Sequence, residues 1–329
     1  MPDRNRLGDT SVRAPSRIVA LASIAFLVLA LSAVIMALSG NWGAWSEMAG
    51  AGVADWRVRP LWLVLAVLSG ATALWTSGAI WGLLFRSSGG QTGMPEAAAV
   101  WLGSNLGRYL PGKVWQMAGL VGYVRARGDS GSGALATALL FQAIMLVTGS
   151  GIGLAVLGSR VFEGVGLWAI GAGGLAVAAA LTPWLLRRIV RTGHRLLREP
   201  GEPAHVSLGG SLLIYAAVGS LFVWSLHGLG FWALLEGLVE ENSVGPLMAT
   251  GVFTASYIVG YLAVIAPGGM IVREGAMASL LSVAGSMALG PAAAVALAAR
   301  LWATAAELAA FGLALSLARV ARMREQPKR

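Results

Sequence analysis

Two short segments of the chain combine a Pro-Gly pair with basic side chains. Pro111-Gly112 is preceded by Arg108 and followed by Lys113, and Pro267-Gly268-Gly269 is followed by Arg273. Proline removes a backbone donor and glycine permits a sharp reversal, so each pair predicts a helix that stops and restarts. The free N–H groups and the dipole of the restarted helix favour an anion. We therefore predict a phosphate site with Arg108, Lys113 and Arg273 as its basic residues.

Further polar residues accompany the two breaks. We predict that the supporting and lining residues are Asn105, Pro111, Gly112, Gln116, Pro267, Gly268, Gly269, Glu274, Arg300 and Glu307. Glu274 is expected to orient Arg273, and Arg300 and Glu307 share a helix face because they are seven apart. A charge at the bilayer centre costs about 2.5–3.5 kcal/mol on insertion scales, so function or mutual pairing is expected. The alternative that local neutralisation and ordinary cytoplasmic turns explain these features stays open.

The composition is that of a chain whose main solvent is lipid. Hydrophobic residues make up 57% of it, charged residues make up 12%, and the mean hydropathy is +0.72. Cysteine is absent and the three histidines are scattered, so we predict no metal centre and no cofactor. The net charge of +9 comes from clusters beside apolar runs, which indicates membrane orientation rather than binding to nucleic acid.

We predict an all-α, polytopic membrane bundle with about eight transmembrane helices plus broken helices at the two Pro-Gly pairs. The expected spans are residues 18–38, 60–85, 134–157, 164–186, 208–229, 246–265, 271–289 and 292–318. The segment 94–128 is apolar but interrupted by polar residues. Irregular backbone is tolerated at membrane depth only where protein or a watery cavity covers it, so we expect a re-entrant helix pair there.

The basic clusters set the predicted orientation. They lie at the N-terminus, over residues 187–198 and at the C-terminus. Under the positive-inside rule this places both termini in the cytoplasm, in a multi-pass protein of the inner (cytoplasmic) cell membrane. Arg57 and Arg59 fall on the outer side, where long side chains can reach the interface.

The two break regions share a short pattern. LPGKVWQMAG at 110–119 matches APGGMIVREG at 266–275 in Pro, Gly and a later Gly. Three identities leave open both a two-fold internal repeat over 17–200 and 206–320 and a chance likeness, within a single transmembrane domain over 1–329. Transporter folds built from repeats place binding sites at paired interruptions of this kind.

At these residues the chain resembles the transmembrane domain of lysylphosphatidylglycerol synthases, a family also described as flippase-like. The motifs are NLGRYLPGKVWQ at Asn105–Gln116 and APGGMIVREGA at Ala266–Ala276. The chain departs from the pattern at Ile271, where the family often has glycine. We expect no soluble aminoacyl-transferring domain like that of the full synthases, so the resemblance implies the membrane function alone. It assigns that function to Arg108, Lys113, Arg273 and Glu274.

The leading hypothesis is a translocator of an anionic lipid, either a phospholipid or a polyprenyl-phosphate-linked sugar. No sequence resembles an ATP site. A membrane enzyme, or an accessory subunit that partners a lipid-linked glycosyltransferase, is the alternative, and the same cavity would then serve as a donor site. A scaffold for other membrane proteins is a third reading. The sequence leaves the lipid, the direction of transport and the oligomeric state open.

Overall fold

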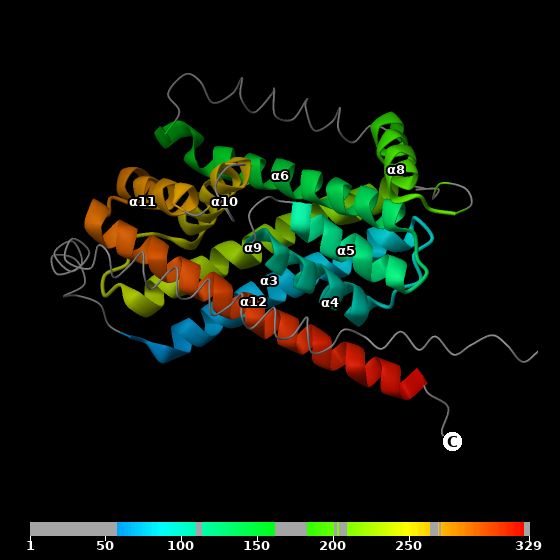
Figure 1. The fold of residues 1–329 in the computed structure, drawn as a ribbon. Helices are drawn as coiled ribbons and strands as arrows, with labels where there is room; N and C mark the ends of the chain where they lie inside the picture. The colour runs from blue at the N-terminus through cyan, green and yellow to red at the C-terminus, as the bar shows by residue number, and fades with distance from the viewer. Residues whose placement is uncertain are drawn as a thin grey trace, which may run out of the picture. The chain divides into compact units, whose positions relative to one another are not determined.

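A computed structural model describes residues 58–109, 114–161, 183–200, 203, 209–263, 269 and 271–325, all within the compact unit Ala49–Arg329. These residues form helices and no β-strand. Four of the helices contain spans that are long and apolar enough to cross a membrane. They are α3 (Pro60–Arg86), α6 (Gly131–Val161), α9 (Gly210–Leu238) and α12 (Leu289–Glu325) (Figure 1). An all-helical fold with four candidate membrane-spanning helices is thus confirmed for the described residues.

Helices α3 and α9 run antiparallel, side by side. Arg59, which precedes α3, donates its backbone N–H to Gly237 O at 3.0 Å, and its guanidinium donates to Glu236 O at 3.1 Å. Near the middle of the pair, the Ser69 hydroxyl donates to Leu226 O at 2.7 Å. Arg59 therefore satisfies backbone carbonyl groups at the C-terminal end of α9, which is a role beyond contact with the membrane interface.

The segment around the first break folds as two short antiparallel helices. We call α4 (Met94–Asn105), the 3-10 helix η1 (Leu106–Tyr109) and α5 (Val114–Ala126) hairpin 1. Asp129 accepts hydrogen bonds from the Gln91 N–H and the Thr92 hydroxyl, so the chain enters and leaves the hairpin at the same place. The 12 and 13 residues of α4 and α5, at about 1.5 Å each, are too short to cross a core of about 30 Å. The predicted helix pair has this form.

A second pair of short helices surrounds the second break. We call α10 (Pro246–Leu262) and α11 (Val272–Ala284) hairpin 2. The sequence predicted two complete spans here, at 246–265 and 271–289, but the helices have only 17 and 13 residues. Eight spans are therefore not shown. The predicted spans 18–38 and 164–186 lie outside the described residues.

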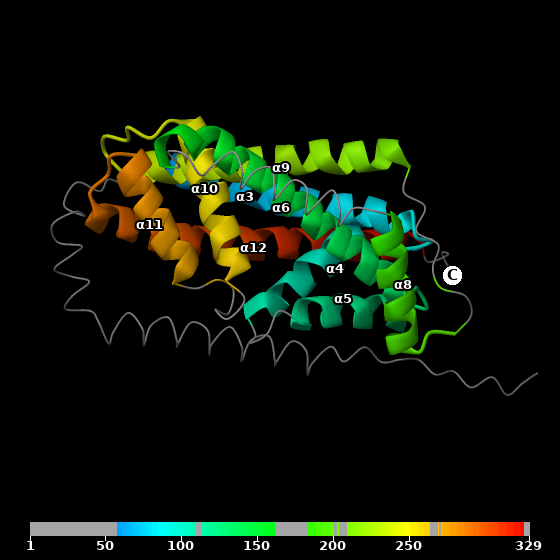
Figure 2. The same cartoon turned by 90° about the horizontal axis from the view of Figure 1, so that it is seen from above.

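The two hairpins start from opposite ends of the α3–α9 pair. Hairpin 1 follows the C-terminus of α3 and hairpin 2 follows the C-terminus of α9, and these two helices are antiparallel (Figure 2). Hairpin 1 packs through α4 on α12, the long helix that follows hairpin 2. Hairpin 2 packs through α10 on α6, the long helix that follows hairpin 1. Both halves thus have the order long helix, hairpin, long helix. The internal repeat remains a prediction consistent with this order.

Glycines and alanines set the close approach of these helices. A Cβ on Gly78 would lie 2.7 Å from Ala98 Cα, and one on Gly149 would lie 2.7 Å from the Trp224 ring. Gly153 similarly faces Ala255. Small residues at helix interfaces are typical of membrane bundles, which lack a hydrophobic drive between helices.

Glu199 fastens α8 (Pro183–Leu197) to the beginning of α6. Its carboxylate accepts the Ser132 N–H at 3.0 Å and the Ser132 hydroxyl at 2.6 Å, as a capping group would. Burial raises the pKa of Glu199, but hydrogen bonds from Ser132, Gly131 and Ser130 together outweigh it and hold the pKa below the ordinary 4.5. The His194 ring lies 3.5 Å from the same carboxylate.

We expect the attachment of α8 to weaken in acid. Because the folded-state pKa of Glu199 is lowered, its contribution to stability is complete above the unfolded-state pKa and is lost as pH falls through the folded-state pKa. Protection of the α8 backbone amides from hydrogen exchange, corrected for the pH dependence of the intrinsic rate, should therefore decrease below about pH 4.5 in the wild type. Glu199→Gln should exchange fast at neutral pH as well, with less acid dependence. Equal exchange profiles for the two proteins would contradict this role.

Candidate functional site

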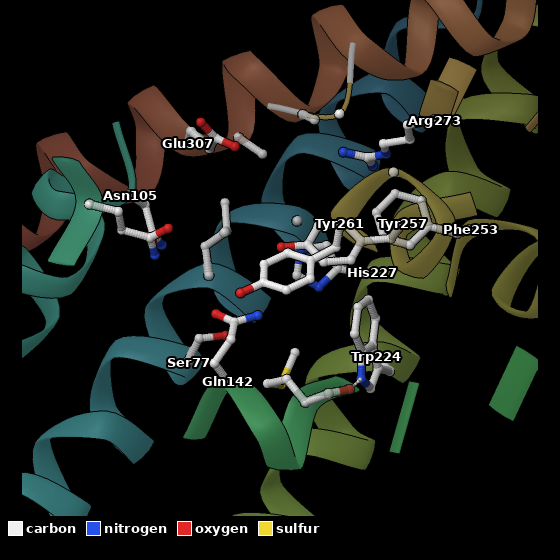
Figure 3. Close-up of a pocket in the computed structure, with 18 of the residues that line it drawn as sticks. Ser77, Asn105, Gln142, Trp224, His227, Phe253, Tyr257, Tyr261, Arg273 and Glu307 are labelled. Carbon is white, nitrogen blue, oxygen red and sulfur yellow. Dashed lines mark hydrogen bonds between the residues drawn. The ribbon is translucent and has the colours of Figure 1, made fainter. Parts of the chain in front are cut away.

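The tips of both hairpins border one cavity of about 240 Å³. Hairpin 1 contributes Asn105 and Gln116, and hairpin 2 contributes Gly260, Gly269 and Arg273. The four long helices complete the wall, with residues that include Ser77, Gln142, Trp224, His227, Arg300 and Glu307. Figure 3 shows Arg273 and Phe253 on one side of this cavity and Asn105 and Ser77 on the other. Residues far apart in the sequence are therefore brought together where the two broken helices meet.

Asn105 and Gln116 tie the two helices of hairpin 1 together at its tip. The Gln116 side-chain amide donates to Asn105 Oδ1 across the break. Gly107 permits this approach, because a Cβ there would lie 2.8 Å from the Gln116 backbone nitrogen. Both residues line the cavity.

The predicted basic residues of hairpin 1 cannot be placed. Arg108 belongs to η1, but its side chain is outside the described part of the structure. Lys113 and the Pro111-Gly112 pair lie outside the described residues, as do Pro267 and Gly268 of hairpin 2. Their predicted roles stay predictions.

Arg273 is held against an aromatic surface. Its guanidinium carbon lies 5.0 Å from the centre of the Phe253 ring and 5.1 Å from that of Tyr257. The two rings are four residues apart, so they lie on the same face of α10. A Cβ on Gly260 would lie 2.6 Å from Arg273 Cβ, so only glycine admits the arginine at this distance. Cation–π attraction of this kind holds a guanidinium in a fixed orientation without neutralising it.

Hairpin 2 turns through two residues with positive φ. Gly269 has φ of 68°, and a Cβ there would lie 2.5 Å from Gly260 O. Ile271, which precedes the first residue of α11, has φ of 71° and ψ of −49°. The backbone at position 271 therefore has a conformation that favours glycine although the residue is β-branched. This turn places Arg273 in the first turn of α11, near the free N–H groups of that helix.

Replacing Ile271 with glycine should stabilise the protein. Positive φ is strained for isoleucine, the side chain is 85% exposed, and little packing is lost. Glycine also has greater freedom in the unfolded chain, which offsets part of the gain. The free energy of unfolding should therefore rise by about 1 kcal/mol. The melting temperature in detergent measures it. Val272→Gly, one position along in the regular helix, is the control and should lower the melting temperature; a similar loss in Ile271→Gly would contradict the strain.

Glu274 lies in a different position from the one predicted. Its carboxylate is 3.4 Å from the Arg300 guanidinium, so it pairs with α12 and does not orient Arg273. Because an α-helix has 3.6 residues per turn, the side chains of neighbouring residues point about 100° apart. Glu274 and Arg273 therefore face different parts of the structure. The side chains are 17% and 19% exposed, and Glu274 Oε2 has no hydrogen-bond partner among the described residues. The pair joins α11 to α12.

Arg300 and Glu307 both line the cavity from α12, as their spacing predicted. Glu307 is 9% exposed and is the one carboxylate on the cavity wall among the described residues. Figure 3 shows Glu307 on the side of Asn105 and away from the aromatic surface that holds Arg273. The cavity therefore has a basic side and an acidic side.

Several cavity residues were not predicted. His227 contacts Val223 O through Nδ1 at 3.0 Å and stacks on Phe253, with ring centres 5.3 Å apart. Tyr257 and Tyr261 continue the aromatic surface of α10. The available signals were weak: His227 and Gln142 are isolated polar residues in apolar runs, and the two tyrosines are four apart before the second break.

No group of three or more acidic or histidine residues in the described part of the chain could hold a metal ion.

No protein-family model matches the chain, and no curated protein matches it. The relation to lysylphosphatidylglycerol synthases consequently rests on the two motifs and remains a prediction.

Proposed function

We propose that this protein binds the phosphate of an anionic membrane lipid in the cavity between the two hairpin tips and moves that lipid between leaflets. The observation that carries the proposal is the cavity itself: two broken helix pairs, starting from opposite ends of α3 and α9, border one space that contains Arg273. Transporters with discontinuous helices place their substrates at such interruptions.

Arg273 is the phosphate ligand in this proposal. A guanidinium can donate two parallel hydrogen bonds to phosphate oxygens, and Phe253 and Tyr257 keep its plane fixed. The N–H groups at the start of α11 add a favourable dipole. Arg108 and Lys113 would approach from hairpin 1. The cavity is smaller than the roughly 300–1,000 Å³ of a drug-sized pocket, so it suits a headgroup while the hydrocarbon chains stay in lipid.

The hairpins provide the alternation that transport requires. Because they start from opposite ends, movement of one tip would open the cavity toward one leaflet and movement of the other would open it toward the opposite leaflet. The sequence predicts two further spans, at residues 18–38 and 164–186. Together with the four long helices, these would give six spans and two hairpins. Both termini and the basic clusters would then lie on the cytoplasmic side of the cell membrane. The proposed topology thus has six spans, whereas the sequence alone predicted about eight.

Reconstitution tests the function. Purified protein in liposomes should accelerate loss of a fluorescent anionic lipid from the inner leaflet, measured by its accessibility to an external quencher. A zwitterionic lipid with the same chains should move more slowly. Protein-free vesicles and vesicles with heat-inactivated protein are the controls. Equal rates in all preparations would refute translocation and leave at most lipid binding.

A further inference from the structure

We propose that the headgroup of the lipid carries a hydroxylated ring, a sugar or a cyclitol, linked to its phosphate. The proposal rests on the proposed function and specifies its substrate class. Open-chain headgroups, such as glycerol, would bind less well at the same phosphate site.

The first observation is the aromatic wall. Phe253, Tyr257 and Tyr261 follow one another along α10, with stacked rings whose centres are 6.5 and 6.4 Å apart. The His227 ring lies nearly parallel to Phe253, at 20°. Tyr257, Tyr261 and His227 are partly exposed, and all of them line the cavity. Phe253 is 2% exposed and Arg273 lies over Phe253 and Tyr257, so Tyr261 is the ring that can cover the C–H face of a hydroxylated ring, and its hydroxyl adds a polar edge.

The second observation is the polar wall that faces it. Asn105, Gln116 and Gln142 line the cavity, and each amide has donors and acceptors on one plane. Asn105 and Gln116 use one of these groups each for their mutual bond, which leaves capacity for further hydrogen bonds. Hydroxyl groups are donors and acceptors at once, so they match amides, whereas a bare phosphate accepts only. The indole N–H of Trp302, another cavity residue, is buried without a partner among the described residues.

The third observation is the position of Arg273 over Phe253 and Tyr257, which leaves Tyr261 as the next ring along the aromatic wall. With the phosphate on Arg273, a ring attached to it would lie between Tyr261 and the amides. Figure 3 shows Tyr261 and Gln142 in the interior of the cavity, between Arg273 and Ser77. A volume of about 240 Å³ admits one such ring and excludes a long oligosaccharide.

Lipid affinities of the full-length protein in detergent test the proposal. The probes are a polyprenyl phosphate with one hexose, the same polyprenyl phosphate without sugar, phosphatidylinositol and phosphatidylglycerol, each titrated by native mass spectrometry. We expect at least one ring lipid to bind about tenfold more tightly than phosphatidylglycerol. The hexose lipid and phosphatidylinositol separate the sugar from the cyclitol. Gln142→Leu and Tyr261→Leu should each lower that ratio by about three- to tenfold.

The outcomes separate this proposal from the translocator function. Equal affinity for all four lipids would overturn the ring inference, although liposome transport of phosphatidylglycerol would still support translocation. A preference that both variants retain would also overturn it, because the preference would arise elsewhere. If a variant does not fold, the wild type can be tested with soluble competitors. Hexose 1-phosphate and glycerol 1-phosphate are each titrated against the bound hexose lipid, which compares a ring headgroup with an open-chain headgroup.

Discussion

Arg273→Ala should lower the rate of anionic-lipid movement at least tenfold in liposomes. A charge-assisted hydrogen bond contributes about 1.5–3 kcal/mol, so losing the guanidinium should weaken phosphate binding by about 10- to 100-fold. The side chain also stacks on Phe253 and Tyr257, so the substitution removes contacts that fix α11 against α10. Initial rates at several lipid concentrations separate weaker binding from slower transport.

Two further variants identify the cause of that loss. Arg273→Lys keeps the charge but loses the planar fork and most of the stacking, so we expect an intermediate rate. Arg195→Ala removes an exposed arginine of α8, remote from the cavity residues, and should keep the wild-type rate. If Arg195→Ala slowed transport as much as Arg273→Ala, net charge rather than the cavity would control the rate.

Breaking the Glu274–Arg300 pair should have the largest effect on stability. Each partner is mostly buried, so removing one leaves a charge without its counter-charge. We expect Glu274→Gln and Arg300→Gln each to lower the free energy of unfolding by about 3 kcal/mol. The double variant should recover much of the loss, because no unpaired charge remains. Denaturant titration in mixed micelles measures all three.

Glu236→Gln is the matched control for this cycle. Glu236 lies 3.8 Å from Arg59, whose side chain is 39% exposed, and such pairs contribute about 0–1 kcal/mol. A loss in the double variant equal to the sum of the single losses would show that Glu274 and Arg300 act independently, contrary to the structure.

The Pro-Gly pairs drew attention to the cavity residues because backbone chemistry leaves few alternatives at membrane depth. A helix must stop where proline and glycine follow each other, and the polar residues nearby must face a cavity or one another. Asn105, Gln116, Arg273 and Glu307 accordingly meet in one cavity. The same logic identified the helix pair at residues 94–128.

Other features depended on tertiary packing. Residues 246–265 form one apolar run, and nothing in the sequence shows that α10 ends at Leu262 and packs on α11. The partner of Glu274 lies 26 positions away on α12, beyond the reach of local spacing. The aromatic wall consists of ordinary apolar and tyrosine residues, which are equally common in a packed core.

A cysteine at position 77 offers the most direct test of the central claim that lipid moves through this cavity. The natural chain has no cysteine, and Ser77 lines the cavity with its hydroxyl bonded to Ala73 O. In Ser77→Cys, modification by a charged methanethiosulfonate reagent should stop transport, and anionic lipid should slow the modification. Ser316→Cys, where an exposed serine makes the same kind of bond to Gly312 O, should be modified without effect. Undiminished transport after complete modification of Ser77→Cys would contradict the account.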